Sequence, residues 1–474
     1  LSPKWANYFS IRGLASSLIW KQKMGVLFGF LKYNGVSQDG KPEGFRRYVI
    51  WRRPRMHYAK TAQKIREQIL RFSGELSSGL PKPARRFVAE MIYGIQARQS
   101  VRLTEIGRAL EERIPLRKTE YRLCRQLKRE GLWERLTRAL CRMAASRIQE
   151  FSLLILDLTD VSKKYARRME YLARVHDGSE GAVANGYWTL QVVGAEVGKT
   201  TLWPLYNRLY SQSCPEFRSE NQEIEEAIET ISSQTQGRGV WVIDRGGDRQ
   251  KLLWYLVKNQ HRFLVRLRQD RHLICRGRPM SVLEIAQACP MLYAETVVKE
   301  EKDQEKVLRI EFGYRVVFLP DGNIPLALVV VKGFGQEPLM LLTNLPLKKT
   351  RKSLWWAVES YITRWKIEET IRFIKQCYQL EDIRLLTYIR LQNMMALVMA
   401  VAYFTMAYLG LRTKLRVLAG HVLRAARRIF GLPECRFYAL ADGIKEHLFG
   451  QKRGLYGCFS TSDPATGQRW LFSP

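Results

Sequence analysis

The chain of 474 residues lacks the motifs of several common classes of protein. It has eight scattered cysteines without a C-x-x-C pair, which argues against a zinc ribbon or a disulfide scaffold and fits a reducing cytoplasm. Six histidines without an H-x-x-x-H pair give little support for zinc-dependent hydrolysis. No G-x-x-x-x-G-K-[ST] segment is present, so nothing indicates an ATP-driven motor.

Acidic residues are also scarce. The chain has 45 Asp and Glu against 78 Lys and Arg, a formal net charge of +33 and a pI near 10.0. Self-repulsion at this charge destabilises a compact chain, and a polyanionic partner relieves it. Nucleic acid is the first candidate and an anionic membrane surface the second. The apolar fraction of 46% is that of a globular protein, and the length suits about two to four domains.

No secretory signal pattern is found at the start, and one long uncharged run is present. Because the chain starts at Leu1 rather than Met, we expect a fragment or an alternative start codon. Residues 394–411, MMALVMAVAYFTMAYLGL, reach the lower limit of a membrane span. The run is rich in Ala, Met and Tyr and has no companion, so a helix buried against a sheet is favoured over a span.

The changing residue pattern predicts an α/β protein with six regions. They are a basic N-terminal arm (1–60), a helical DNA-binding domain (61–150), the first part of an α/β core (151–269), a β-strand insertion (270–349), the second part of the core with a long helix (350–411) and a basic C-terminal region (412–474).

In the helical region, residues 101–130 predict two helices joined by a turn that contains Pro115. On the second helix, four cations fall within about 60° of one another, opposite a stripe of leucines. The cations are Lys118, Arg122, Arg125 and Arg129. Such a helix can rest on a core and face DNA phosphates, although an ordinary solvated basic face has the same pattern.

Two aspartates follow apolar runs that predict strands. Asp157 ends the run FSLLILD, with Asp160 as a competitor, and Asp244 ends VWVID. Acids at strand ends can meet at one edge of an α/β sheet. The alternative for Asp244 is an ordinary turn acid, and Asp248 is expected to cap the next helix.

A third acid lies in the segment YITRWKIEETIRFIK, residues 361–375. On one ideal helix, Tyr361, Arg364, Glu368 and Lys375 share a stripe within about 60°. The stripe is either a salt-bridged surface or part of a site that handles phosphate. Two strand-end aspartates and Glu368 are hard oxygen donors that suit two Mg²⁺ ions, with the neighbouring cations on DNA phosphates.

The four-residue spacing Tyr361-x2-Arg364-x3-Glu368-x6-Lys375 resembles the signature of the insertion-sequence-four family of bacterial DDE transposases. DRGGD (244–248) is similar to the stretch that carries the family's second aspartate, and LDLTDVSKKYARRMEYL (156–172) to the region of the first. The resemblance spans about residues 151–411.

The resemblance implies an RNase H-like core with Asp157, Asp244 and Glu368 as catalytic metal ligands for two Mg²⁺ ions, with Mn²⁺ as a substitute. It implies Tyr361, Arg364 and Lys375, with Arg245 beside the second aspartate, as DNA contacts. It also implies a cut-and-paste transposase that acts as a homodimer on double-stranded DNA, in the bacterial cytoplasm at the nucleoid and without a membrane. Relatives hold a flipped base with an aromatic residue of the insertion. Trp is absent from 270–349, so this residue would be Phe312, Tyr314, Phe318 or Phe334.

Overall fold

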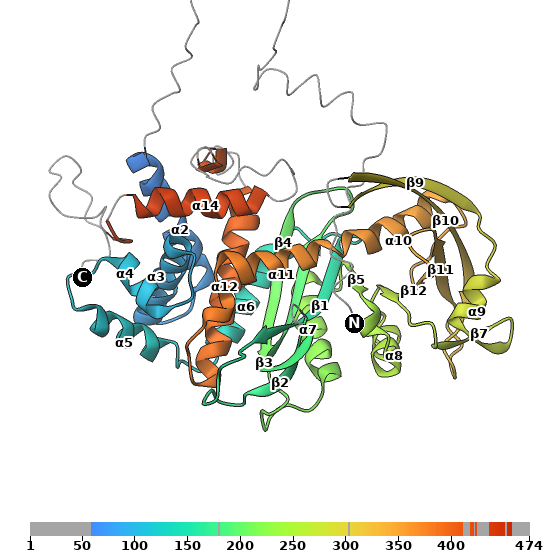
Figure 1. Cartoon of the computed structure of the whole chain (residues 1–474), viewed down its shortest axis with the longest axis horizontal. Coiled ribbons are helices and arrows are strands. Elements are labelled where there is room, and N and C mark those ends of the chain that lie inside the picture. The colour runs from blue at the N-terminus through green and yellow to red at the C-terminus, as the bar shows by residue number, and fades with distance from the viewer. Residues whose placement is uncertain are drawn as a thin grey trace, which may run out of the picture.

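The computed structural model describes residues 58–178, 181–301, 304–410, 418–420, 422–423, 436–450 and 453–456. Along its long axis, helices lie at one end, a mixed sheet in the middle and a β-rich region at the other end (Figure 1). The fold is therefore mixed α/β with a helical N-terminal region. The expected basic arm and the basic C-terminal region lie mostly outside the described residues, so their roles stay predictions.

Helices fill the described chain before the first strand. They are α2 (Tyr58–Leu76), α3 (Lys82–Arg98), α4 (Leu103–Leu110), α5 (Leu116–Gln126) and α6 (Leu132–Ala145). The predicted helix pair at 101–130 is present as α4 and α5, and Pro115 is the N-cap residue of α5. Leu123 and Leu127 are fully buried, which confirms the apolar stripe.

The central sheet has ten strands in the order β2-β3-β1-β5-β6-β12-β11-β10-β9, and β4 pairs with β3. The strands of its first half are β1 (Leu153–Ser162), β2 (Ala173–Asp177), β3 (Ala182–Ala195), β4 (Leu202–Tyr210), β5 (Val240–Ile243) and β6 (Phe263–Arg266). Strand β1 is antiparallel to β3 and parallel to β5, and β5 is parallel to β6. The crossovers contain α7 (Glu220–Thr235), the 3-10 turn η1 (Arg245–Gly247) and α8 (Gln250–Lys258).

The predicted β insertion extends this sheet. Its elements are β7 (His272–Cys275), β8 (Arg278–Ser281), α9 (Val282–Gln287), β9 (Tyr293–Glu301), β10 (Gln304–Val317), β11 (Leu326–Lys332) and β12 (Leu339–Thr343). Strand β12 pairs with β6 through Leu342 and Val265, which lie in register. The insertion and the core therefore share one continuous sheet, and the pair β7-β8 forms a small sheet of its own.

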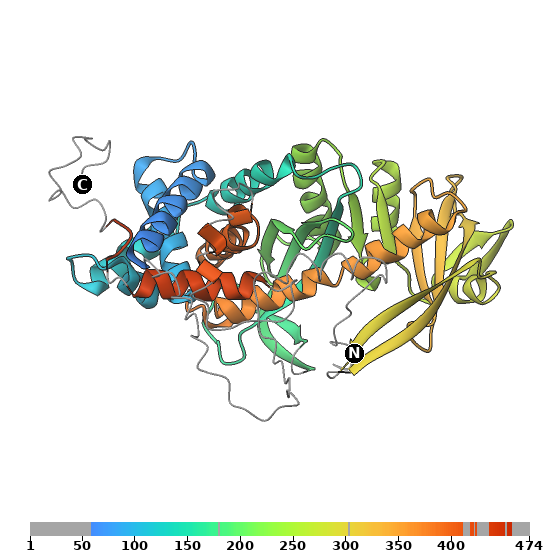
Figure 2. The same cartoon turned by 90° about the horizontal axis from the view of Figure 1, so that it is seen from above.

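The chain then returns across the sheet in a long helical segment. It comprises α10 (Arg351–Thr363), α11 (Lys366–Cys377), the turn η2 (Leu380–Asp382), α12 (Tyr388–Met406), the turn η3 (Tyr408–Gly410) and, after a gap in the description, α14 (Arg436–Phe449). Helices α10 and α11 follow nearly one line over the sheet, from the β-rich end toward the helical end (Figure 2).

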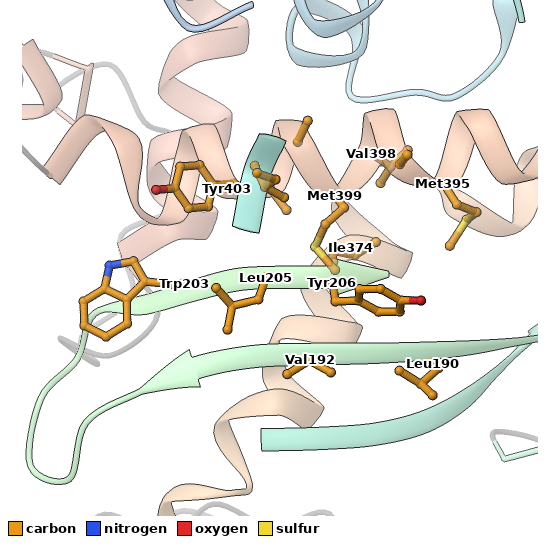
Figure 3. Packing of buried hydrophobic residues seen from close by; sticks show 14 of the residues in the cluster. Leu190, Val192, Trp203, Leu205, Tyr206, Ile374, Met395, Val398, Met399 and Tyr403 are labelled. Atoms are coloured by element: carbon orange, nitrogen blue, oxygen red, sulfur yellow. The ribbon is translucent and has the colours of Figure 1, made fainter. Parts of the chain in front are cut away.

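Helix α12 is the predicted apolar run. Among the described residues it is the one helix long and apolar enough to cross a membrane, and most of it is buried inside the protein. Figure 3 shows Met395, Met399 and Tyr403 of α12 facing Leu205 and Tyr206 of β4. The prediction of a buried core helix is confirmed for this segment.

The two faces of the sheet belong to two different apolar clusters. Along β1, Leu154 and Leu156 join the cluster that contains α7, α8 and α12, whereas Leu153 and Ile155 join the cluster that contains α10 and the start of α11. This alternation is what a period of two residues produces in a strand buried on both faces. It decides on which face the next residue, Asp157, lies.

Candidate active site

Asp157 and Asp244 are neighbours across the sheet. The parallel pairing of β1 with β5 ends at Leu156 and Ile243, so the two aspartates are the next residues of the two strands. Leu156 and Ile243 lie in the same apolar cluster, and by alternation both aspartates lie on the opposite face, under α10 and α11. Adjacent strands are about 4.8 Å apart, which brings the two residues together.

One detail of the expected strand is wrong. Strand β1 does not end at its acids but continues to Ser162, because β3 supplies pairing partners as far as Gly186. Only β5 stops at the level of Asp157. Asp157 therefore lies in the interior of β1, beside the end of β5.

Asp160 lies further along β1 and has a different partner. Its Oδ1 is 3.4 Å from Lys375 Nζ, and its Oδ2 is buried without a hydrogen-bond partner in the described part of the chain. Lys375 Nζ is also 3.4 Å from Glu381 Oε1. The assignment of Lys375 as a DNA contact stays a prediction, and in this conformation its ammonium group is shared by two carboxylates.

The segment 361–375 is not the single helix that the sequence predicts. Helix α10 ends at Thr363 and α11 begins at Lys366, and the junction is closed by bonds from residue i to i−3, such as Arg364 N to Tyr361 O at 3.1 Å. Such bonds turn the chain more tightly than an α-helix does, so the ideal angular step fails there. The burial of the predicted stripe changes along its length: Tyr361 is 1% exposed in the core, whereas the side chain of Glu368 is 44% exposed.

Arg364 lies at this junction and links the acids. Its Nη2 donates to Glu368 Oε1 at 2.7 Å, and its Nη1 is 3.6 Å from Asp157 Oδ2. Its guanidinium group lies 5.6 Å from the centre of the Tyr361 ring. Burial acts to lower the pKa of Arg364, but Tyr361 and the three carboxylates of Asp157, Glu368 and Asp244 raise it above its ordinary value. Arg364 is therefore a buried cation that pairs with Asp157 and Glu368 and feels the charge of Asp244.

The positive charge of Arg364 does not fully offset the negative charge of the neighbouring acids. Burial raises the pKa of Asp157 to about 7, and the charges of Asp244 and Glu368 act in the same direction against the opposing charge of Arg364. Asp157 has one further bond, from Leu158 N to its Oδ1 at 2.9 Å. Asp244 accepts from Gly246 N at 2.8 Å, as a turn acid would. The three carboxylates thus carry excess negative charge in a site that is partly shielded from solvent.

Three neighbouring carboxylates are hard oxygen donors of the kind that hold Mg²⁺. No group of three His, Cys, Asp or Glu side chains within the described ranges is already arranged to hold a metal ion. In this structure Arg364 occupies the position between Asp157 and Glu368 and pairs with both. The chemistry of the donor set fits a divalent metal.

The other predicted contacts near the site fall in different environments. Arg245 is exposed on η1, directly beside Asp244. Tyr361 and Arg364 are buried, so contact with DNA would require both to move. Asp248 does not cap α8, because it is buried and binds Arg271 Nε and Arg268 N, both at 2.7 Å. The Asp248 carboxylate therefore binds Arg268 and Arg271 instead of the start of α8.

The predicted cationic face of α5 is only partly open to solvent. Lys118 and Arg125 are exposed, and Arg129 lies beyond the end of the helix and is half-buried. Arg122 instead binds Glu112 at 2.9 Å and also Glu90. Contact of these four cations with DNA stays a prediction. Of the four, Lys118 and Arg125 form the part of the face that is exposed to solvent.

The aromatic candidates of the insertion are largely packed. Phe312 is fully buried, and Tyr314 and Phe334 pack against the same apolar cluster. Phe318 is half-buried. Holding a flipped base with one of these rings stays a prediction, and Phe312 is the least accessible of them.

Sequence reasoning overlooked a polar pair beside the acids. Gln191 of β3 lies opposite Asp157, and Asn207 of β4 lies opposite Gln191. They are 1% and 2% exposed, and their amide groups have no hydrogen-bond partner in the structure as described. Such groups are costly and cluster at functional positions. The signal in the sequence was a lone Gln between Leu190 and Val192, which are both core residues.

No protein-family model matches the chain, and no curated protein sequence matches it. Among solved structures, the chain is similar to a piggyBac transposase in a synaptic complex with hairpin DNA, with a TM-score of 0.42 and 9% sequence identity. The likeness covers 87% of this chain and 83% of that chain. The function proposed below is drawn from the residues of the site.

Proposed function

We propose that this protein is a DDE transposase of the insertion-sequence-four type. It would bind the inverted-repeat ends of its element, cleave them by metal-dependent phosphodiester chemistry and join the freed 3′ ends to target DNA. The observation that carries the proposal is the placement of three acids: Asp157 and Asp244 follow paired residues of β1 and β5, and Arg364 pairs with both Asp157 and Glu368. Their convergence comes from two strands and one helix that are far apart in the sequence.

The sheet offers a second support. Strands β4-β3-β1 are antiparallel, and β5 and β6 continue beside β1 in parallel, with α7 and α8 in the crossovers. We assign these elements to an RNase H-like core that the β insertion interrupts. In open α/β sheets, functional residues gather beside the carboxyl ends of strands, and β5 ends at Ile243, directly before Asp244 and beside Asp157.

In this proposal Asp157, Asp244 and Glu368 would hold divalent cations, two Mg²⁺ or the substitute Mn²⁺. Such cations, when bound, activate a water or a 3′-hydroxyl group and stabilise the leaving oxygen. Arg364 orients Asp157 and Glu368, because its two Nη atoms reach both. Arg245 and Lys375 flank the acids and would bind neighbouring phosphates.

The net charge of +33 supports DNA as the partner. A homodimer that pairs two ends is part of the proposal. Two alternatives share some of these features: a catalytically inert DNA-binding derivative that inhibits transposition, and a structure-selective nuclease with the same core. Short inverted repeats on both sides of the reading frame favour transposition over both.

The test is cleavage of supercoiled plasmid that carries the DNA flanking the reading frame, with Mg²⁺. We expect nicks or double-strand breaks at the boundary of the element. Glu368→Gln should abolish them while binding to the ends stays within a few-fold, because it removes a metal ligand and leaves the exposed cations in place. Tight binding without cleavage in Mg²⁺ or Mn²⁺ would favour the inert derivative, and a fully active Glu368→Gln protein would refute the site.

A further inference from the structure

The segment after β1, residues 163–170, presents an aromatic ring and several cations to solvent. Tyr165 is 88% exposed, more than any other exposed large hydrophobic residue in the described part of the chain. The Lys164 ammonium group lies 6.0 Å from the centre of its ring, at the limit of a cation–π contact. Arg167 and Arg168 are exposed next to it, and the first acid of the segment is Glu170.

A second segment adds to this surface. Arg384 is exposed between the buried Ile383 and Leu385, and the next residue, Leu386, is 60% exposed. Glu170 N donates to Leu386 O at 2.8 Å, so the two segments lie side by side. We call this surface the basic-aromatic ledge; it consists of Lys164, Tyr165, Arg167, Arg168, Arg384 and Leu386.

The backbone of the ledge is held in place. Lys163 N donates to Asn185 O at 2.6 Å, and Asn185 Nδ2 donates to Ala166 O at 3.1 Å. The buried Lys163 side chain donates from Nζ to Ile383 O at 2.7 Å and also to Glu381 O. Tyr187 OH donates to Glu170 O at 2.6 Å. The exposed ring of Tyr165 is therefore carried by a supported loop.

The ledge lies close to the acids along β1. Ser162, the last residue of β1, is five residues beyond Asp157, which is about 17 Å at 3.3 Å per residue. This distance equals about five base pairs of duplex at 3.4 Å each. Lys375 and Glu381 lie between the two, since both belong to the ion pairs around Asp160.

We propose that the basic-aromatic ledge binds a DNA strand with unpaired bases, a few nucleotides from the reacting phosphate. The ring of Tyr165 stacks on a base, and Arg167, Arg168 and the neighbouring Arg384 bind the phosphates that flank it. Positive charge interleaved with an aromatic ring is the combination that binds single strands with little sequence preference. The inference rests on the proposed function for the identity of the DNA.

The experiment is photocrosslinking of the full chain to a duplex of the element's own end that carries three unpaired terminal bases. Single 5-iododeoxyuridines are placed at successive positions, and Ca²⁺ replaces Mg²⁺ so that the probe is not consumed. We expect an adduct on Tyr165 from one of the unpaired bases and none from the paired positions. Tyr165→Ala should weaken binding of this probe about 5-fold or more, and Tyr165→Phe should not, because stacking needs only the ring.

The matched control is Phe151→Ala, which removes an exposed aromatic side chain (57%) just before the other end of β1. It should bind the probe like the wild type, and thermal melting checks that each variant is folded. The inference would be overturned if Tyr165→Ala binds and cleaves like the wild type and the wild type forms no adduct on Tyr165. Cleavage by the wild type would still uphold the proposed function in that case. An adduct on Tyr165 from a wild type that never cleaves would support the ledge and reject the transposase.

Discussion

Two arginines of this protein sit in similar surroundings but belong to different kinds of cluster. Arg122 of α5 and Arg364 at the α10-α11 junction each bridge two carboxylates. Around Arg122, two cations (Arg122 and Arg86) meet two acids (Glu90 and Glu112), so charge is balanced. Arg364 pairs with Asp157 and Glu368, and Asp244 is the neighbour of Asp157 across the sheet, so this cluster has three acids and one cation.

The pKa values reflect this difference. Burial acts to raise the pKa of Glu112, yet hydrogen bonds from Thr119 and Arg122 hold it below its ordinary value. The pKa of Asp157 is raised to about 7, by burial first and then by Asp244 and Glu368. A balanced cluster fixes helices together, whereas an unbalanced one retains carboxylates that can bind added cations.

The largest expected effect separates the acids of β1. Asp157→Asn should reduce plasmid cleavage by more than about 100-fold. This loss is larger than the usual effect of mutating a residue that only hydrogen-bonds to a metal ligand. Asp160→Asn should cost less, because Asp160 binds Lys375. Cleavage rates in Mg²⁺ measure both, and the reverse order would show that Asp160 is the metal ligand.

Removing each arginine tests the comparison directly. Arg122→Met should lower the free energy of unfolding by about 1–3 kcal/mol, because Glu90, with a side chain only 1% exposed, and Glu112 lose hydrogen bonds. Mg²⁺ should not restore it. Arg364→Met should instead gain more stability from Mg²⁺ than the wild type does, since the three acids lose their cation. Urea unfolding with and without Mg²⁺ measures both effects, and equal responses would remove the distinction between the clusters.

The pH dependence of stability should carry the signature of Asp157. Its pKa is about 7 in the folded protein and near 3.8 in the unfolded chain, so between these values the folded state binds the extra proton. Its contribution to stability is therefore full below about pH 4 and is lost as the pH rises through 7. Without metal, Asp157→Asn should flatten this decline relative to the wild type. Identical curves in urea unfolding between pH 4 and 8 would argue against a buried, protonated Asp157.

The smallest expected effect concerns the exposed part of α5. Arg125→Ala should reduce the magnitude of the slope of log K against log[salt] for DNA binding by about 0.9, the value for one phosphate contact. Arg122→Ala should leave the slope unchanged, because its guanidinium group is bound to carboxylates. Binding titrations at several salt concentrations measure both. An unchanged slope in Arg125→Ala would show that Arg125 does not contact DNA and that the basic face of α5 is an ordinary solvated surface.

Much of the fold followed from local patterns. The apolar runs FSLLILD and VWVID predicted β1 and β5, and the pattern of residues 101–130 predicted α4 and α5. These predictions succeed because apolar runs and helical periodicity depend on residues a few positions apart. The break at Arg364 and the anchoring of Asp248 were missed, because both depend on partners distant in the sequence or on packing.

By itself, the sequence determined that the chain is basic, that its core alternates strands and helices, and that Asp157, Asp244 and Glu368 are candidate acids. Only the tertiary structure decided which cations serve those acids. It placed Arg364 on Asp157 and Glu368, Lys375 on Asp160 and Arg122 on Glu90 and Glu112. The reason is physical: a long side chain on one helix reaches several partners, and the choice among them depends on which elements pack around it.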